Sequence, residues 1–139
     1  MKGLESEIFT NGCFDILHIG HMELLKYCKS LGRVTVGLNS DQSVKRLKGR
    51  LRPINNQKDR ATMLLSCKYV DDVVIFDEDT PIELIVKLKP DIIVKGGDYM
   101  FSEIVGSKLA EIRIFEYLEG YSTTTIISKI KSEDLGHIK

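Results

Sequence analysis

Five short segments of this chain have the composition of β-strands, and three of them are continuous apolar runs. The segments are residues 7–10, 34–38, 72–76, 91–95 and 112–115. A strand with one face in water alternates apolar and polar residues, whereas a strand buried on both faces can be apolar throughout. The continuous runs in the first, third and fourth segments therefore predict a parallel sheet that helices cover on both faces.

Helical patterns stand between these segments. They cover residues 18–31, 56–68, 81–88, 103–110 and 123–131. Thr80 is predicted to cap the third helix, with Pro81 in its first turn and Glu83 completing a capping box. Ser122 or Thr123 is predicted to cap the last helix. Right-handed crossovers then give an α/β fold, a Rossmann-like, open, doubly wound sheet of five parallel strands with helices on both faces.

The composition excludes several classes of function. The 139 residues fit a single domain, residues 1–139, and carry 20 Lys and Arg against 20 Asp and Glu. Zero net charge argues against a general binder of nucleic acid or membrane surfaces. No apolar run approaches the ~20 residues of a membrane span, and the N-terminus lacks a secretory signal. Three widely spaced cysteines indicate free thiols, so we expect a cytoplasmic protein that handles something small.

Ligands of doubly wound folds bind beyond the carboxyl ends of the strands, and the richest motif follows the first strand. There, Gly12-Cys13-Phe14-Asp15 leads into His18-Ile19-Gly20-His21. Two histidines three apart lie on one face of a helix start, where unpaired amides and the positive dipole end attract phosphate. Gly20 lets a phosphate approach the backbone between the two rings. The whole string favours a phosphate site over a capping or solvated histidine.

A basic stretch follows the second strand, within residues 39–55, which we interpret as a loop. Its cations are Lys45, Arg46, Lys48, Arg50 and Arg52. No aromatic residue is interleaved, so bases would have no stacking platform. A solvated loop and a segment that closes over a polyphosphate both remain open.

The remaining strand ends carry weaker signals. Residues 77–79 are acidic and are interpreted as complementing the dipole of the next helix, not as a metal cluster. Asp98 could accept hydrogen bonds from a ribose or a base, or form a turn. Residues 119–124 place a glycine and hydroxyls at a helix start, a second place to hold phosphate. Cys13 lacks an arranged catalytic partner and is interpreted as structural.

The motif from Gly12 to His21 resembles the signature of the cytidylyltransferase-like nucleotidyltransferases. Nearly the whole chain is similar to bacterial D-glycero-β-D-manno-heptose 1-phosphate adenylyltransferases, which make ADP-heptose for lipopolysaccharide and related glycans. The strings that carry this resemblance include residues 10–15, 37–41, 46–49, 52–55, 59–60, 74–81, 94–99 and 119–124. The resemblance implies transfer of AMP from ATP to the heptose phosphate with release of pyrophosphate. It also implies Mg²⁺, held mainly by the triphosphate and by no protein ligand directly.

The resemblance also implies roles for individual residues. His18, His21 and Lys48 are the expected catalytic residues, and Asp15 is expected to orient the histidine-bearing turn. The expected nucleotide and phosphate ligands are Thr10, Asn11, Gly12, Cys13, Phe14, Asp15, Gly20, Gly96, Asp98, Tyr99, Gly120, Ser122, Thr123 and Thr124. Candidates for binding the acceptor are Asn39, Asp41, Arg46 and Arg52.

Glycerol-3-phosphate cytidylyltransferases are the alternative, because they share the histidine motif. They carry an Arg-Thr pair where this chain has Tyr117-Leu118, which favours the heptose branch. Arg46, Arg50 and Arg52 are candidates to replace that arginine. The segment 105–112 is shorter than in the heptose enzymes. The resemblance therefore does not define the part of the acceptor pocket near this segment. A non-catalytic nucleotide-binding module and a nucleic-acid binder are the remaining hypotheses.

The resemblance implies partners as well. ATP and a phosphorylated heptose are the expected substrates, with no nucleic acid and no membrane. Many relatives are fused to a sugar kinase, so we expect a separate heptose kinase and a phosphatase in the same pathway. Family members are often homodimers, and the sequence does not settle this point.

Overall fold

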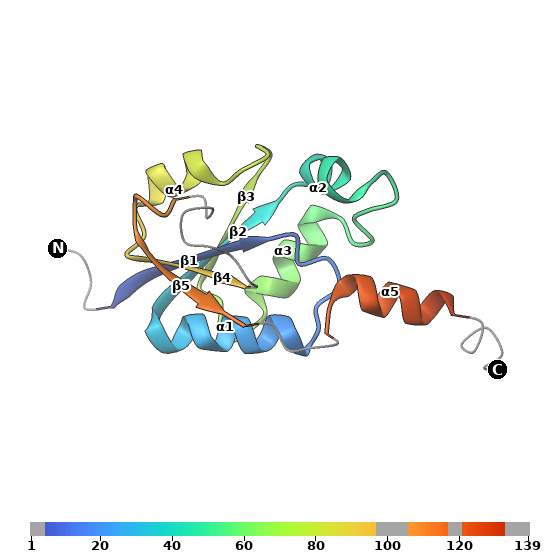
Figure 1. Ribbon diagram of the computed structural model, residues 1–139, viewed down its shortest axis with the longest axis horizontal. Helices are drawn as coiled ribbons and strands as arrows, with labels where there is room; N and C mark the ends of the chain where they lie inside the picture. Colours follow the sequence, from blue (N-terminus) through green and yellow to red (C-terminus); the bar gives the residue numbers. More distant parts are fainter. Residues whose placement is uncertain (1–4, 97–105, 117–120, 133–139) are drawn as a thin grey trace.

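Five parallel strands form one sheet at the centre of the molecule (Figure 1). The computed structural model describes residues 5–96, 106–116 and 121–132. The strands are β1 (Ser6–Gly12), β2 (Gly32–Asn39), β3 (Asp72–Phe76), β4 (Ile92–Gly96) and β5 (Glu111–Phe115). Their order is β3-β2-β1-β4-β5, and every pair is parallel. The chain therefore winds outward from β1 in both directions, and the switch point lies between β1 and β4.

Helices cover both faces of the sheet, as the continuous apolar runs predict. The helices are α1 (Ile19–Leu31), α2 (Asp41–Lys48), α3 (Gln57–Leu65), α4 (Ile82–Leu88) and α5 (Thr123–Lys131). Ile8 of β1 packs in one buried cluster with Leu25 of α1 and Leu64 of α3. Its neighbour Phe9 packs in a second cluster with Ile85 of α4. Ile8 and Phe9 are each 1% exposed, because successive side chains of a strand point to opposite faces and both faces are covered.

The sequence interpretation of residues 39–55 as a loop was wrong for its first half, because α2 occupies Asp41–Lys48. The Ser40 side chain caps this helix by accepting a hydrogen bond from the Ser43 N–H. Only Ser43 and Val44 of α2 are buried. Val44 and Leu47 are the only apolar residues of this eight-residue helix. Its apolar content is therefore too low to suggest a helix, and the Ser40 cap is a better guide.

Two further helix predictions also need correction. Residues 106–109 form a turn where a helix over 103–110 was predicted, and residues 103–105 lie outside the described residues. Helix α4 follows Pro81 with no side-chain cap, so the predicted Thr80 cap is wrong. The acidic segment before it contacts α2 instead: Asp77 accepts from Ser40, and Asp79 pairs with Arg46 at 2.9 Å.

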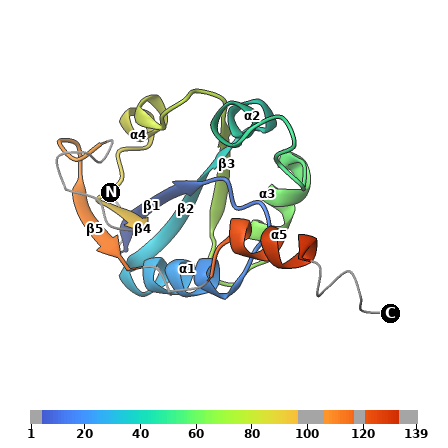
Figure 2. The same ribbon diagram turned by 45° about the vertical axis from the view of Figure 1, so that its right-hand side comes forward.

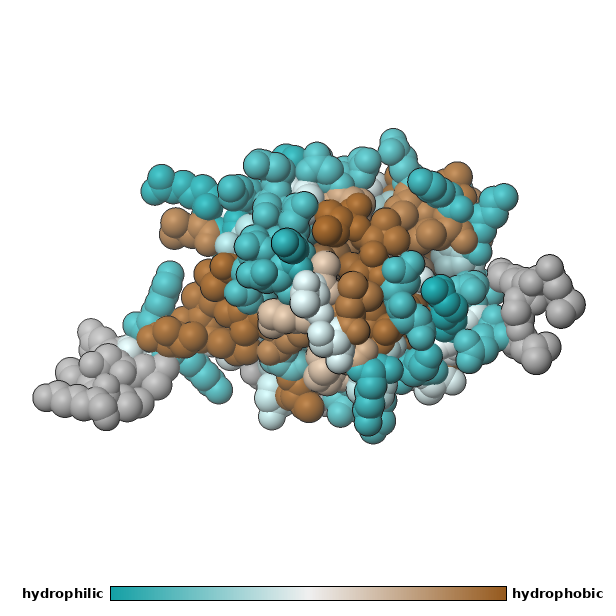
Figure 3. All heavy atoms as spheres, turned by 180° about the vertical axis from the view of Figure 1, so that it is seen from behind, coloured by the Kyte–Doolittle hydropathy of each residue, from teal (hydrophilic) through white to brown (hydrophobic). Residues whose placement is uncertain are grey.

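Helix α5 lies beside the start of α1 and extends past the end of the sheet (Figures 1 and 2). None of its nine residues is buried, and Ile130 is 65% exposed. On the rear face of the molecule, hydrophobic residues gather in several patches between hydrophilic ones (Figure 3). Among the described residues, no helix is both long enough and apolar enough to span a membrane.

Candidate active site

The chain turns sharply where β1 ends, and this turn leads into α1. Phe14 adopts a left-handed backbone conformation, with φ of 45°, which is uncommon for a non-glycine residue. Its ring is 5% exposed and lies 5.0 Å from the ring of His21, measured between centroids. A Cβ added at Gly12 would lie 3.1 Å from the same ring, so glycine gives Phe14 the room to pack there. The turn is thus held by buried aromatic packing directly beneath the first turn of α1.

His18 and His21 form a stacked pair at the start of α1. Their ring centroids are 3.8 Å apart, and the ring planes differ by 28°. Nδ1 of His18 accepts from the Gly20 N–H at 3.1 Å, and Nδ1 of His21 accepts from the His18 N–H at 3.3 Å. A neutral imidazole that accepts at Nδ1 carries its proton on Nε2. The reciprocal cap therefore fixes the tautomer of both rings and makes both Nε2–H groups donors.

The environment keeps this histidine pair neutral. Burial lowers the pKa of His21 to about 4, with a further decrease from the neighbouring His18. Burial also lowers the pKa of His18. Both rings are therefore neutral hydrogen-bond donors at pH 7.

The depressed pKa of His21 predicts that the protein loses stability as the pH falls. The unfolded chain protonates this histidine near its ordinary pKa of 6.5, whereas the folded chain does so only near 4. Between these values the unfolded state binds more protons, so the free energy of unfolding rises with pH and falls on acidification. We expect a loss of about 2–3 kcal/mol between pH 7 and pH 4 from this residue.

Urea denaturation at a series of pH values measures this loss. His21→Gln removes the titrating ring and is expected to flatten the curve between pH 4 and pH 6.5. The same slope in His21→Gln and in the wild type would show that other groups are responsible.

Gly20 gives the histidine pair its space. A Cβ at this position would lie 2.9 Å from Cε1 of His18, closer than ordinary packing allows. Gly20→Ala is expected to displace the His18 ring and to lower turnover about 10- to 100-fold, because small misplacements of a catalytic group are costly. Steady-state kinetics of the variant, with its circular dichroism as a control for folding, tests this expectation. Unchanged turnover would mean that the ring position is not critical.

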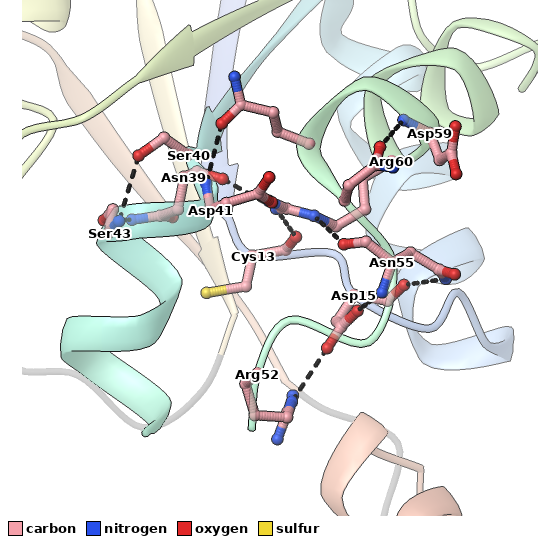
Figure 4. A network of polar contacts seen from close by, with 12 residues as sticks. Cys13, Asp15, Asn39, Ser40, Asp41, Ser43, Arg52, Asn55, Asp59 and Arg60 are labelled. Carbon is pink, nitrogen blue, oxygen red and sulfur yellow. Dashed lines mark hydrogen bonds and ion pairs between the residues drawn. The ribbon is translucent and has the colours of Figure 1, made fainter. Parts of the chain in front are cut away.

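Asp15 connects the histidine-bearing segment to the loop before α3 (Figure 4). Its carboxylate is 1% exposed and accepts hydrogen bonds from the Ile54 and Asn55 N–H groups and from Arg52 Nε at 2.9 Å. Burial alone would raise the pKa of Asp15, but these hydrogen bonds outweigh it and lower the pKa. None of these hydrogen bonds goes to His18 or His21, so Asp15 orders residues 52–55 where sequence reasoning expected it to orient the histidine turn.

Arg60 is the largest fully buried side chain among the described residues, and sequence reasoning gave it no role in the site. Its guanidinium donates to the backbone carbonyls of Cys13, Asn39 and Asn55 and to the carboxylate of Asp41, at 2.8–2.9 Å (Figure 4). Cys13 follows β1, Asn39 ends β2, Asp41 begins α2, and Asn55 precedes α3. One side chain of α3 therefore ties together the segments after two adjacent strands and the loop that Asp15 orders.

Two lysines lie near the same turn. Lys48 is exposed at the end of α2, and its charge is the largest effect opposing the burial that raises the pKa of Cys13. Lys95 is at the end of β4, partly buried, with its Nζ 3.4 Å from Oδ1 of Asn11. The structure thus brings the predicted Lys48 close to the motif after β1 and adds Lys95, which sequence reasoning did not single out.

The start of α5 lies against the start of α1. Ser122 caps α5 by accepting from the Thr125 N–H at 2.9 Å, as predicted. Thr123 Oγ1 donates to the Ile16 carbonyl at 3.1 Å. Tyr121 Cβ lies 3.4 Å from the position of a Cβ on Gly20. Two helix N-termini therefore point into the same region, one with two imidazole donors and one with hydroxyl groups.

The other predicted site residues divide into three groups. Asp98, Tyr99 and Gly120 lie outside the described residues, as do Tyr117 and Leu118. The second group lies within the described residues and consists of Gly96, Thr124 and Thr10. Gly96 ends β4 and is buried, and Thr124 is exposed. Thr10 is 1% exposed, with no hydrogen-bond partner for its Oγ1 in the described part of the chain.

The four acceptor candidates form the third group, and each is engaged with protein partners. Asn39 is 4% exposed and donates to Ser43, Asp41 pairs with Arg60, Arg46 pairs with Asp79, and Arg52 pairs with Asp15. We therefore interpret Asn39 as a structural residue and not as an acceptor ligand, because its buried side-chain amide stabilises the turn into α2. Nothing within residues 5–96, 106–116 and 121–132 gathers three side chains able to ligate a metal ion.

An open parallel sheet with a His-x-Gly-His helix start at its switch point, facing a second helix N-terminus, defines an α/β nucleotidyltransferase domain. A family model described as cytidylyltransferase-like matches residues 9–132. The chain belongs to the cytidylyltransferase-like family and is a nucleotidyltransferase. The predictions of fold class and enzyme class are therefore confirmed.

Curated relatives share high identity with this chain. The bifunctional protein HldE of Campylobacter concisus is 58% identical over 132 residues, which are 94% of this chain and 28% of that protein. The bifunctional protein HldE of Helicobacter pylori J99 is 61% identical over 126 residues, which are 89% of this chain and 27% of that protein. The chain thus spans less than a third of the length of these curated relatives.

Solved structures share the fold. The lipopolysaccharide core biosynthesis protein of Thermoplasma volcanium aligns with a TM-score of 0.67 and 30% identity, over 83% of this chain and 97% of that chain. Pantoate-beta-alanine ligase of Francisella tularensis aligns with a TM-score of 0.64 and 17% identity, over 94% of this chain and 68% of that chain. The second likeness concerns the fold alone.

Proposed function

We propose that this chain transfers AMP from ATP to D-glycero-β-D-manno-heptose 1-phosphate, giving ADP-heptose and pyrophosphate. The observation that carries the chemistry is the pair of imidazoles whose Nδ1 atoms are used by the backbone, leaving two Nε2–H donors at a helix start. The substrate is supported by identity of about 60% with HldE proteins and by the likeness to a lipopolysaccharide core biosynthesis protein.

The reaction needs charge stabilisation and positioning, not a covalent nucleophile. An oxygen of the acceptor phosphate forms a bond to the α-phosphorus of ATP. The bond from the α-phosphorus to the bridging oxygen breaks, and pyrophosphate leaves with that electron pair. The Nε2–H groups of His18 and His21 donate to phosphoryl oxygens around the α-phosphorus. Lys48 supplies positive charge beside the same phosphates.

The start of α5 suits the leaving pyrophosphate. Tyr121 lies beside Gly20, and Thr123 contacts the Ile16 carbonyl just before α1. We propose that the amides of this helix start are within reach of a triphosphate whose α-phosphate contacts the histidine pair. We propose that Mg²⁺ is held there mainly by triphosphate oxygens, where it would neutralise charge. The Nε2–H groups of His18 and His21 and the backbone amides at the start of α5 then remain available to contact phosphoryl oxygens.

Transfer of CMP to glycerol 3-phosphate is the second candidate. It is favoured by the family description, cytidylyltransferase-like, and it would use the same phosphate site. Asp98 and Tyr99, which we propose to lie near the nucleoside, are outside the described residues, so the choice of base falls to experiment.

Pyrophosphate release in the presence of Mg²⁺ tests both candidates. ATP and CTP are each combined with heptose 1-phosphate and with glycerol 3-phosphate. Turnover with ATP and the heptose supports the adenylyltransferase. Turnover only in the combinations that contain CTP would overturn the proposed nucleotide, while the proposed phosphate contacts of His18 and His21 would stand. No turnover in any combination would overturn the proposal.

The proposed reaction places the protein between other enzymes. A kinase must supply the heptose phosphate at the anomeric oxygen, and a phosphatase in the same pathway must remove any phosphate not carried into ADP-heptose. We propose that the kinase and the phosphatase are separate from the residues of this chain and that all three activities are located in the cytoplasm. The HldE relatives are bifunctional and more than three times as long as the matched segment.

A further inference from the structure

Lys95 is a cation at the switch point for which the reaction described above has no use. It lies in β4, whose neighbour is β1, and its Nζ lies 3.4 Å from Oδ1 of Asn11 at the end of β1. Both residues are near the carboxyl ends of their strands, the edge where ligands of this fold bind. Lys95 therefore reaches the same strand end that leads into the histidine pair.

Lys95 and the histidine pair lie on opposite faces of the sheet. Phe9 and Ile93 pack in the cluster of α4, and two residues further along each strand Asn11 and Lys95 point to that same face. A Cβ added at Gly37 would contact both Phe9 and Asn11, as expected for one face. The histidines belong to α1, which packs on the other face against Ile8 and Val34.

The start of α5 is on the side of α1, away from α4. Thr123 donates to the Ile16 carbonyl just before α1, and both ribbon views place α5 beside α1 and α4 across the sheet (Figures 1 and 2). The end of β1 therefore separates two phosphate-attracting regions. One contains His18, His21 and the start of α5, and the other contains Asn11 and Lys95.

In-line substitution at phosphorus requires the groups that bind the attacking substrate to be separated from those that bind the leaving group. The attacking and leaving oxygens lie on opposite sides of the phosphorus atom. If pyrophosphate leaves toward α5, the attacking oxygen must approach from the side away from it. On that side Lys95 places a cation near the carboxyl end of β4.

We propose that Lys95 binds the phosphate of the acceptor substrate, a phosphate monoester, and directs its oxygen at the α-phosphorus. This inference rests on the proposed nucleotidyl transfer. In the step, one acceptor oxygen bonds to the α-phosphorus and the bond to pyrophosphate breaks, while the remaining acceptor oxygens keep the ammonium as counter-ion. The ammonium lowers the repulsion between two anionic substrates, which otherwise opposes their approach.

The surroundings of Lys95 fit this role. Burial lowers the pKa of Lys95, so a dianionic phosphate beside it would be favoured as a partner for the ammonium form. Asn11 accepts from the ammonium and fixes its direction at the strand end. Lys48, by contrast, is exposed at the end of a surface helix and approaches the turn after β1 from α2.

The test compares the wild type with Lys95→Met, which keeps the length of the side chain and removes its charge. Lys95→Arg restores a cation, and Lys87→Met removes an exposed charge from α4 as the matched control. Kinetics give KM for ATP and for the acceptor separately. Loss of one charged hydrogen bond is expected to raise the acceptor KM about 10- to 100-fold in Lys95→Met. KM for ATP should stay unchanged, Lys95→Arg should recover part of the effect, and Lys87→Met should match the wild type.

A binding measurement separates this inference from the reaction itself. Inorganic phosphate is titrated calorimetrically into protein saturated with a non-hydrolysable ATP analogue. Weaker phosphate binding in Lys95→Met than in the wild type, with equal affinity for the analogue, supports the inference even if the acceptor is not a heptose. Equal phosphate affinity, or an equal loss for acceptor and nucleotide, overturns the role of Lys95 while wild-type turnover still supports the proposed function. A wild type that turns over none of the substrates overturns the proposed function instead.

Discussion

Replacing either His18 or His21 by alanine is expected to lower turnover about 100-fold or more, by analogy with the loss of one oxyanion donor. In the proposed reaction each ring donates its Nε2–H to the reacting phosphates, because the backbone already occupies its Nδ1. Alanine removes that donor at the atoms where charge develops. The measurement is kcat from pyrophosphate release, with circular dichroism confirming the fold.

Two conservative variants separate the donor from the cap at His21. His21→Asn places an amide oxygen near the position of Nδ1, so it can still accept from the His18 N–H, but it has no group at Nε2. His21→Gln places an amide N–H near Nε2 and loses the cap. We expect asparagine to keep the stability and lose the turnover, and glutamine to retain more turnover. Near-normal turnover in a folded alanine variant would contradict the proposed role of the pair.

Replacing Arg60 by methionine is expected to destabilise the protein by about 3–5 kcal/mol. Methionine fills much of the space but leaves the carbonyls of Cys13, Asn39 and Asn55 without their donor. It also leaves Asp41 without the partner that now lies at 2.8 Å. Urea denaturation measures the loss as a lower midpoint at constant slope.

Arg33→Met is the matched control for Arg60→Met. Arg33 pairs with Glu7 at 3.4 Å, and both side chains are substantially exposed, so its removal should change the stability by less than about 1 kcal/mol. Arg60→Lys keeps the charge but has no planar fork to reach four acceptors, and it should lie between the wild type and methionine. Equal effects of Arg60→Met and Arg33→Met would show that the buried network contributes little.

The sequence was sufficient for the sheet and for the location of the histidine pair. Apolar runs reveal which segments are buried on both faces, and in a parallel sheet that burial fixes where the carboxyl ends meet. The pair of histidines and the capped start of α5 could thus be assigned to one edge of the sheet from the order of residues alone. Helix α2 was missed because only two of its eight residues, Val44 and Leu47, are apolar, and its start is marked by the Ser40 cap instead.

The sequence by itself determined the five strands, the two covered faces of the sheet and the histidine motif, because each of these depends on neighbours along the chain. Only the tertiary structure decided how Arg60, Asp15 and Lys95 are used. Their partners lie 5 to 84 residues away, and periodicity carries no information about which distant carbonyl or amide a buried charge will meet. Burial of a charge is favourable only where such partners converge, and that convergence exists only after the strands have paired.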